Sequence, residues 1–189
     1  MTVEIVAIQA DLVDVARAYA RAAAPPVCIV NPANSHLRHG AGCAAAISVA
    51  AGPDFQKWSD QSVLDEGPVS VGHCRMGPGF GAVLRVAHVV GPRVVNRTVT
   101  LKDQQNLANC VREAILQAEF EALPTILIPA VSSGLFGFPK NLCASILVQV
   151  ALSLAPRLES VKQIIFVNND ELTTNLFKRA LEDARGGAA

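Results

Sequence analysis

Short, uninterrupted hydrophobic runs rich in β-branched residues constrain the fold of this chain most strongly. A strand that is apolar on both sides of its pleat belongs to a sheet that is covered on both faces. We predict strands of such a sheet at residues 3–8, 27–30, 69–71, 84–90, 125–128 and 163–167.

Helical hydrophobic patterns separate these runs along most of the chain. We predict helices at residues 13–24, 43–51, 54–64, 103–120, 140–154 and 172–184. Strands that alternate with helices favour a three-layer α/β/α sandwich around a mostly parallel sheet. We expect a single domain at residues 1–185 and a flexible tail at 186–189. The Gly- and Pro-rich stretch at 75–83 has no strand-to-helix context, so we interpret it as a hairpin or excursion between strands rather than a phosphate loop.

Charge and hydropathy narrow the possible partners. The chain has 16 Lys and Arg against 16 Asp and Glu. This balance gives no basic footprint for nucleic acid, so we expect no nucleic-acid partner. No stretch approaches the roughly 20 apolar residues of a membrane span, and the acidic Glu4 lies where a signal peptide would be basic or apolar. We therefore expect no membrane association and a cytoplasmic or nuclear location.

The cysteines favour reduced thiols over a disulfide or zinc site. They are odd in number, widely spaced, and without any CxxC or CxxH pair. We predict no metal site and no cofactor. The residues are Cys28, Cys43, Cys74, Cys110 and Cys143.

Two loops at predicted strand ends carry glycines suited to anion binding. The first runs from Asn31 to Gly42 and leads into a helix of small residues. Its glycines allow close backbone approach, and the free amides at the helix start favour a pyrophosphate. The second runs from Pro129 to Pro139. Its backbone amides can bind a second phosphate, and Phe136 offers an aromatic surface to a ribose or base. From the residues alone, both loops can also be ordinary glycine turns.

Other nucleotide and hydrolase motifs are missing. The chain has no GxxxxGK[ST], its Gly40-Ala41-Gly42 lacks the remainder of a dinucleotide fingerprint, and its serines stand in no GxSxG elbow.

The motif IVNPANSHLRHGAGCAAAI resembles the macro-domain signature, in which a strand ends in an NxAN turn followed by a glycine triplet and a small-residue helix. The segments IPAVSSGLFGFP and RVAHVVGP are similar to that family's other ligand loop and to one of its strands. Finer features look like the macro modules of large poly-ADP-ribose polymerases and like viral macro domains. The resemblance covers residues 3–184. It implies the macro-domain fold, an α/β/α sandwich with a mixed sheet, and ADP-ribose as ligand.

Carried over residue by residue, the resemblance implies adenine contacts from the Asp11 carboxylate and the Leu12 amide. Asp11 also fits the N-cap of the following helix. The remaining ligand-binding positions lie in the two loops and at the start of the helix after the first loop: Asn34, Gly40, Ala41, Gly42, Cys43, Ser132, Ser133, Gly134, Leu135 and Phe136.

Two residues match positions of family members that hydrolyse ADP-ribose from proteins. Asn34 would orient the distal ribose or a water, or would stabilise its own turn. His39 would help to position or transfer a proton, or would fix the loop. Ala41 replaces a usual glycine, which puts turnover in more doubt than binding.

The resemblance therefore implies a domain that binds ADP-ribose and ADP-ribosylated proteins and removes mono-ADP-ribose from them. The alternative is a non-catalytic reader of mono- or poly-ADP-ribosylated proteins. Hydrolysis of a free ADP-ribose derivative is a further possibility.

Overall fold

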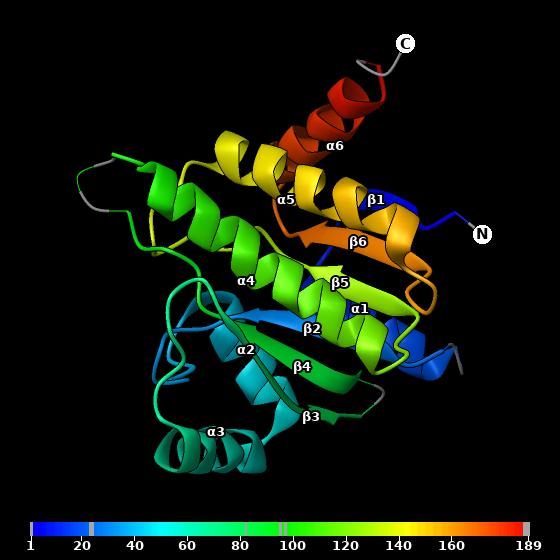
Figure 1. Ribbon diagram of the computed structural model, residues 1–189. Coiled ribbons are helices and arrows are strands. Elements are labelled where there is room, and N and C mark those ends of the chain that lie inside the picture. Colours follow the sequence, from blue (N-terminus) through cyan, green and yellow to red (C-terminus); the bar gives the residue numbers. More distant parts are fainter. Residues whose placement is uncertain (1, 23–24, 82, 95, 97, 187–189) are drawn as a thin grey trace.

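One six-stranded sheet organises the computed structural model, which describes residues 2–22, 25–81, 83–94, 96 and 98–186 (Figure 1). The strand order is β1-β6-β5-β2-β4-β3. Every neighbouring pair is parallel except β3 and β4, which confirms a mostly parallel, mixed sheet. The strands are β1 (Glu4–Gln9), β2 (Val27–Pro32), β3 (Cys74–Phe80), β4 (Val83–Val89), β5 (Thr125–Ile128) and β6 (Gln163–Asn168).

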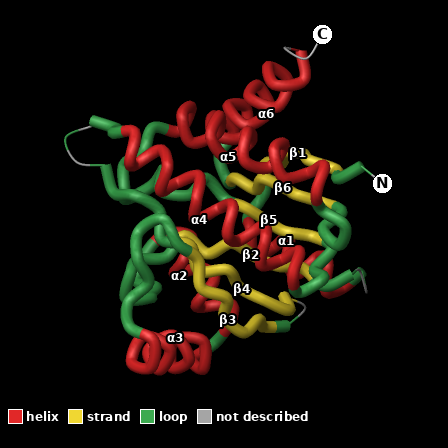
Figure 2. The backbone as a smooth tube through the Cα atoms, in the orientation of Figure 1, coloured by secondary structure: helices red, strands yellow, loops and turns green. Residues whose placement is uncertain are grey.

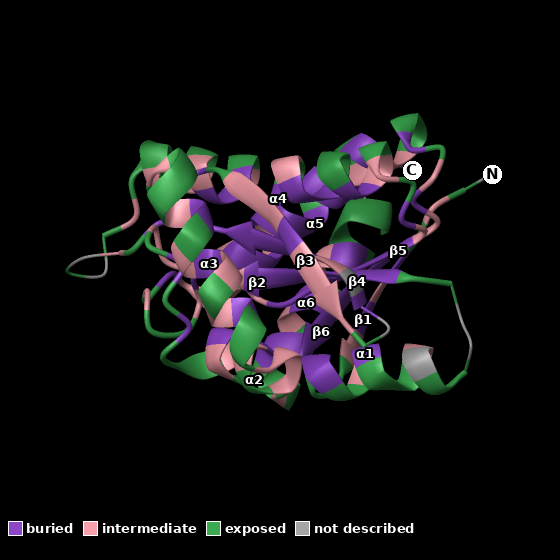
Figure 3. Ribbon diagram, turned by 90° about the horizontal axis from the view of Figure 1, so that it is seen from below, coloured by how far each residue is buried: buried purple, intermediate pink, exposed green. Residues whose placement is uncertain are grey.

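Helices cover both faces of this sheet, as the sequence predicts. Helices α4, α5 and α6 lie on one face, α1 and α2 lie on the other, and α3 lies beside the β3 edge (Figures 2 and 3). The predicted helices are present, and their ends lie within two residues of the prediction, except that α1 ends at Arg21 and its predicted end at residues 23–24 lies outside the described residues. They are α1 (Leu12–Arg21), α2 (Gly42–Ala51), α3 (Pro53–Glu66), α4 (Leu101–Phe120), α5 (Lys140–Leu154) and α6 (Glu171–Gly186).

The two faces of the sheet explain why its strands read as continuous apolar runs. Along β2, Cys28 and Val30 join the core beneath α4 and α5, whereas Val27 and Ile29 join the core beneath α1 and α2. Alternate side chains point to opposite faces of a strand, so burial of both faces requires apolar residues at successive positions. Figure 3 shows the buried residues concentrated in this central layer.

At the sheet edge, one prediction is wrong and another is confirmed. Residues 69–71 form no strand, because this segment turns and the Val69 amide donates to Ser35 O. The Gly- and Pro-rich stretch is a hairpin, as predicted: its first part is β3, the edge strand, which pairs antiparallel with β4. An edge strand tolerates Pro78, which cannot donate a hydrogen bond, and Gly77 leaves space that Trp58 and His88 occupy.

The chain end and the cysteines complete the description. Gly186, predicted to begin the tail, ends α6, and residues 187–189 lie outside the described part of the chain. The five cysteines are free thiols, as predicted, although Cys43 and Cys74 are only partly buried. Across the described residues, no helix is both long and apolar enough to cross a membrane.

Candidate functional site

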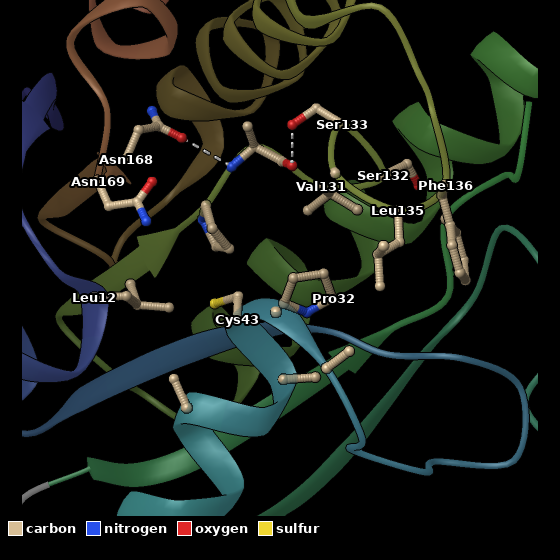
Figure 4. A pocket seen from close by; sticks show the side chains of 18 of the residues that line it. Leu12, Pro32, Cys43, Val131, Ser132, Ser133, Leu135, Phe136, Asn168 and Asn169 are labelled. Carbon is tan, nitrogen blue, oxygen red and sulfur yellow. Dashed lines mark hydrogen bonds between the residues drawn. The ribbon is translucent and has the colours of Figure 1, made fainter.

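A cleft of about 630 Å³ opens where the parallel strands end, at their carboxyl edge. Open α/β sheets bind ligands at this edge. Most of the lining comes from residues 10–13 after β1, 32–34 and 40–44 at and after the end of β2, Gly91 after β4, 129–136 after β5, and 167–170 at the end of β6 (Figure 4).

The first wall is the glycine loop, defined here as residues 34–42. Asn34 organises its beginning: the side-chain Oδ1 accepts hydrogen bonds from the His36 and Arg38 amides at 3.2 and 3.1 Å, and Nδ2 donates to Arg38 O at 2.6 Å. An amide nitrogen carries two hydrogens. Asn34 therefore holds its turn and still has one donor left for a group in the cleft.

The second half of the glycine loop presents free backbone donors. Ala41 is the N-cap of α2 and has an extended backbone, and no side chain caps the helix. The amides of residues 40–44 donate to no acceptor within the described part of the chain. Open space surrounds the Cα of Gly40 and Gly42, and Gly42 has a φ of 58°, which favours glycine. Unsatisfied amides at a helix start form an anion site.

The opposite wall is the serine loop, defined here as residues 130–138. The amides of Gly134, Leu135 and Phe136 likewise donate to no acceptor among the described residues. Asn168 anchors the start of this loop, since its Oδ1 accepts from the Ala130 amide at 3.1 Å, and this bond is drawn in Figure 4. Phe138, 1% exposed, anchors its end in the core.

Ser132 gives the serine loop a strained conformation. Its φ is 63°, a left-handed value that is uncommon for a residue with a side chain. Its hydroxyl is buried and has no hydrogen-bond partner among the described residues, and a Cβ added to Gly91 would lie 2.2 Å from Ser132 Oγ. Strain of this kind is found where a backbone is held for a function.

His39 does not line the cleft. Its ring is 7% exposed and contacts Asn31 and Ser59 behind the glycine loop. Burial lowers the pKa of His39 to about 4, although the nearby Asp60 carboxylate acts in the opposite direction. The two predicted catalytic side chains, Asn34 and His39, therefore do not meet in the cleft, and the geometry favours the loop-fixing alternative for His39.

Asp11 lines the cleft at the start of α1, where its N-cap alternative is confirmed and its adenine contact stays a prediction. One carboxylate oxygen, Oδ1, accepts from the Val13 and Asp14 amides at 2.8 and 3.1 Å and so caps α1. The other oxygen remains for a ligand donor in the cleft. Cys43 lies nearby, and burial, with a smaller contribution from Asp11, raises the pKa of its thiol to about 12. The thiol is therefore protonated and a poor nucleophile near neutral pH.

The structure places all the predicted ligand-binding residues in the lining of the cleft. It adds a polar group that the sequence reading missed, made of Lys140, Asn168, Asn169, Asp170 and Thr173. The run Asn-Asn-Asp directly after a buried strand was the available signal, because that strand ends at the same edge of the sheet as the others.

No cluster of three or more His, Cys, Asp or Glu in the described ranges could hold a metal ion. The titratable lining residues are Asp11, Arg38, Cys43, Lys140 and Asp170. Lys140 and Asp170 neutralise each other at 3.3 Å, so the site offers mainly backbone and amide donors.

Comparison with known proteins agrees with this geometry. The sequence model of the Macro domain family matches residues 30–147. The O-acetyl-ADP-ribose deacetylase of Salmonella newport is 33% identical over 81% of this chain and 85% of its own. The human protein mono-ADP-ribosyltransferase PARP14 is 34% identical over 84% of this chain, which corresponds to 9% of that protein. Among solved structures, a mutant of the Oceanobacillus iheyensis macrodomain with ADPR has a TM-score of 0.77 and 26% identity, covering 84% of this chain and 86% of its own.

Proposed function

This chain belongs to the macro domain family, and we propose that its cleft binds ADP-ribose and hydrolyses the bond that links mono-ADP-ribose to modified proteins. Its partners would then be ADP-ribose and ADP-ribosylated proteins. Two similar proteins support this class of ligand. One is the O. iheyensis macrodomain mutant whose structure is with ADPR, and the other is the O-acetyl-ADP-ribose deacetylase of Salmonella newport.

One observation supports this ligand: two sets of backbone amides that have no partner among the described residues line opposite walls of one cleft. Amides of residues 40–44 belong to the glycine loop, and those of 134–136 belong to the serine loop. Each set is suited to one phosphate, so a diphosphate satisfies both. The free oxygen of Asp11 can accept the exocyclic amine of an adenine at the other end of the cleft.

The distal ribose would then lie beside Asn34 and the start of the glycine loop. The unused Nδ2 hydrogen of Asn34 can donate to a ribose hydroxyl or to an attacking water. Among the described residues, the lining contains two carboxylates, Asp11 after β1 and Asp170 after β6, and no histidine. We therefore expect hydrolysis to depend on positioning and on the substrate's own phosphate as the proton acceptor.

The same scarcity of a protein base supports the second candidate, a non-catalytic reader of ADP-ribosylated proteins. A reader needs the same amides and the same Asp11, but it needs no group that activates water. The two candidates differ only in turnover.

Single-turnover release of ADP-ribose from a mono-ADP-ribosylated protein tests this proposal. Wild type is compared with Asn34→Ala and with Asn109→Ala, a control for loss of an asparagine on α4 outside the cleft. Release by wild type and Asn109→Ala that collapses in Asn34→Ala supports a hydrolase. Binding without release supports the reader, and O-acetyl-ADP-ribose, assayed in parallel, detects activity confined to a free derivative.

A further inference from the structure

A buried polar cluster lies directly behind the glycine loop and consists of Asn31, His39, Ser59 and His88. Asn31 Nδ2 lies 3.2 Å from His39 Nδ1 and 3.0 Å from His88 Nδ1. His39 Nε2 lies 2.9 Å from Ser59 Oγ on α3. All four side chains are buried. Nothing in the proposed chemistry uses this cluster, so its role needs a separate explanation.

Ser59 determines where the proton of His39 lies. The single hydroxyl hydrogen of Ser59 is donated to Phe55 O at 2.9 Å within α3. Ser59 Oγ must therefore accept from His39, which requires a hydrogen on His39 Nε2. A neutral imidazole with its proton on Nε2 has a bare Nδ1, so Asn31 Nδ2 donates to that atom.

The same amide nitrogen determines which ring nitrogen of His88 carries the proton. Asn31 Nδ2 has two hydrogens, and the second points to His88 Nδ1. His88 therefore also carries its proton on Nε2, where no described residue offers it a hydrogen-bond partner. The Phe55 and Trp58 rings stack on His88, each with its centroid 5.3 Å away. Gly77 is required here, because a Cβ would approach His88 Nε2 to 2.7 Å.

Side chains of helix α3 also hold the backbone of the glycine loop, on the side where the cluster lies. Gln56 Nε2 donates to Leu37 O at 3.1 Å, and Gln56 Oε1 accepts from the His39 amide at 3.4 Å. Asp60 pairs with Arg38 at 2.9 Å. The segment that leads into Gly40 is therefore held through both its backbone and the His39 ring.

We propose that Asn31 and His88 are positioning residues for the glycine loop: the Asn31 amide holds His39 as a neutral imidazole protonated on Nε2, and His39 braces the loop without exchanging protons with a ligand. This inference rests on the proposed function for its consequence in the cleft. It assigns roles to two residues that lie outside the lining.

The charged and titratable groups around the two rings agree with neutral imidazoles. Asp60 on α3 is the carboxylate that acts on His39, while Arg75 on β3 and His39 itself act against a charge on His88. Burial dominates for both rings and lowers the pKa of His39 to about 4 and that of His88 to about 3. Neither ring then changes charge between about pH 5 and 8, the range in which an ordinary histidine titrates.

Ring-nitrogen NMR of the free protein tests the tautomers directly. We expect His39 and His88 to carry hydrogen on Nε2 and not on Nδ1, with signals that stay nearly constant between about pH 8 and 5. Protonation of Nδ1 on either ring, or titration of His39 in that range, would overturn the inference. Because no ligand is present, the result stands even if wild type fails to bind ADP-ribose, which would contradict only the proposed function.

Substitutions of His39 separate positioning from proton transfer. We expect His39→Ala to weaken ADP-ribose affinity and to slow release together, release by on the order of 100-fold, because the loop is misplaced. His39→Gln, whose amide can donate to Ser59, should recover both in parallel. A proton carrier gives the opposite pattern for His39→Gln: affinity is retained, while release falls by on the order of 100-fold or more.

Asn31→Asp reverses the role of the amide. A carboxylate between two Nδ1 atoms favours protonated rings, so ADP-ribose affinity should become dependent on pH between about pH 5 and 8, where wild type is flat.

If this variant does not fold, Ser59→Ala replaces it, with Ser62→Ala on the same helix as the matched control. Shifted Gly40 and Gly42 amide resonances in Ser59→Ala, but not in Ser62→Ala, support the inference. Unshifted resonances contradict it.

Discussion

The glycine loop and the serine loop line opposite walls of one cleft, but different interactions hold them. Side chains of α3 and a buried histidine cluster brace the glycine loop from behind. The serine loop is held at its start by one side chain, Asn168, and otherwise by backbone hydrogen bonds, such as Phe138 N to Ser132 O at 3.0 Å, and by one buried ring, Phe138. Both loops nevertheless present the same feature, a row of free amides.

This difference indicates how each wall can fail. The glycine loop depends on polar side chains whose protonation is fixed, so changes in charge should disturb it. The serine loop depends on packing and on a left-handed Ser132, so changes in volume should disturb it. Variants of the two walls should therefore differ in whether charge or volume disturbs them.

Loss of the buried ring at the end of the serine loop should have the largest effect. Phe138→Ala empties a fully buried site and should lower the free energy of unfolding by about 3–5 kcal/mol in urea denaturation. Phe120→Ala, at an exposed position on α4, is the matched control and should change stability by less than about 0.5 kcal/mol. Similar losses in both variants would contradict the assignment of Phe138 as the anchor.

Acid should destabilise the protein through the cluster behind the glycine loop. His39 and His88 have folded pKa values of about 4 and 3, below their ordinary values, so the unfolded chain binds more protons as pH falls. The contribution of the two neutral imidazoles to stability is fully present above the unfolded pKa of about 6.5, and it is lost as pH falls from there towards the folded pKa values. Between about pH 7 and pH 5 we expect a loss of about 2 kcal/mol per imidazole in urea denaturation. His39→Gln should make the free energy of unfolding depend less on pH. An unchanged dependence on pH in that variant would contradict the contribution of His39.

A methyl group at Gly91, behind the serine loop, should lower the free energy of unfolding by less than the loss of the Phe138 ring does. In Gly91→Ala the new Cβ would collide with Ser132 Oγ, and we expect a loss of about 1–3 kcal/mol together with weaker ADP-ribose binding. Ser132→Gly removes the colliding hydroxyl and relieves the left-handed strain. In a double-mutant cycle, the Gly91→Ala/Ser132→Gly protein should therefore recover much of the loss, whereas simple additivity would show that the two residues do not interact.

The smallest effect on stability should come from loss of the ion pair between Lys140 and Asp170. Hydrogen bonds from the Thr173 amide and hydroxyl, and then Lys140, hold the pKa of Asp170 below its usual range. Asp170→Asn keeps an N-cap but loses an exposed ion pair, so the loss should be about 0.2–1 kcal/mol. This difference should be present near neutral pH and vanish as pH falls through the lowered pKa. Persistence of the difference in acid would assign it to packing.

The sequence predicted the layers and the two loops well, because both follow from local patterns. Continuous apolar runs required a sheet covered on both faces, and all predicted ligand-binding residues line the cleft. The hairpin at residues 75–83 was predicted, but β3 was not counted among the strands of the sheet, because glycine and proline are poor strand residues, although an edge position tolerates them.

The histidine cluster could not be predicted for a different reason. Asn31, Ser59 and His88 come from β2, α3 and β4, so only the folded chain brings them together. A histidine beside a glycine loop favours a catalytic interpretation in sequence, and only its burial and its partners distinguish bracing from proton transfer. Asn169 and Asp170 were missed because a polar run after a strand is also what an ordinary turn contains.

Calorimetric titration of the protein with ADP-ribose tests the central claim most directly, with Asp11→Ala and Asp14→Ala as the paired variants. Asp14 is a neighbouring carboxylate on α1 that lies outside the cleft and pairs with Arg17. We expect binding by wild type and Asp14→Ala, and affinity reduced by about tenfold or more in Asp11→Ala, which loses a charge-assisted hydrogen bond. Absence of binding by wild type, or equal affinity in the two variants, would contradict the assignment of this cleft to ADP-ribose.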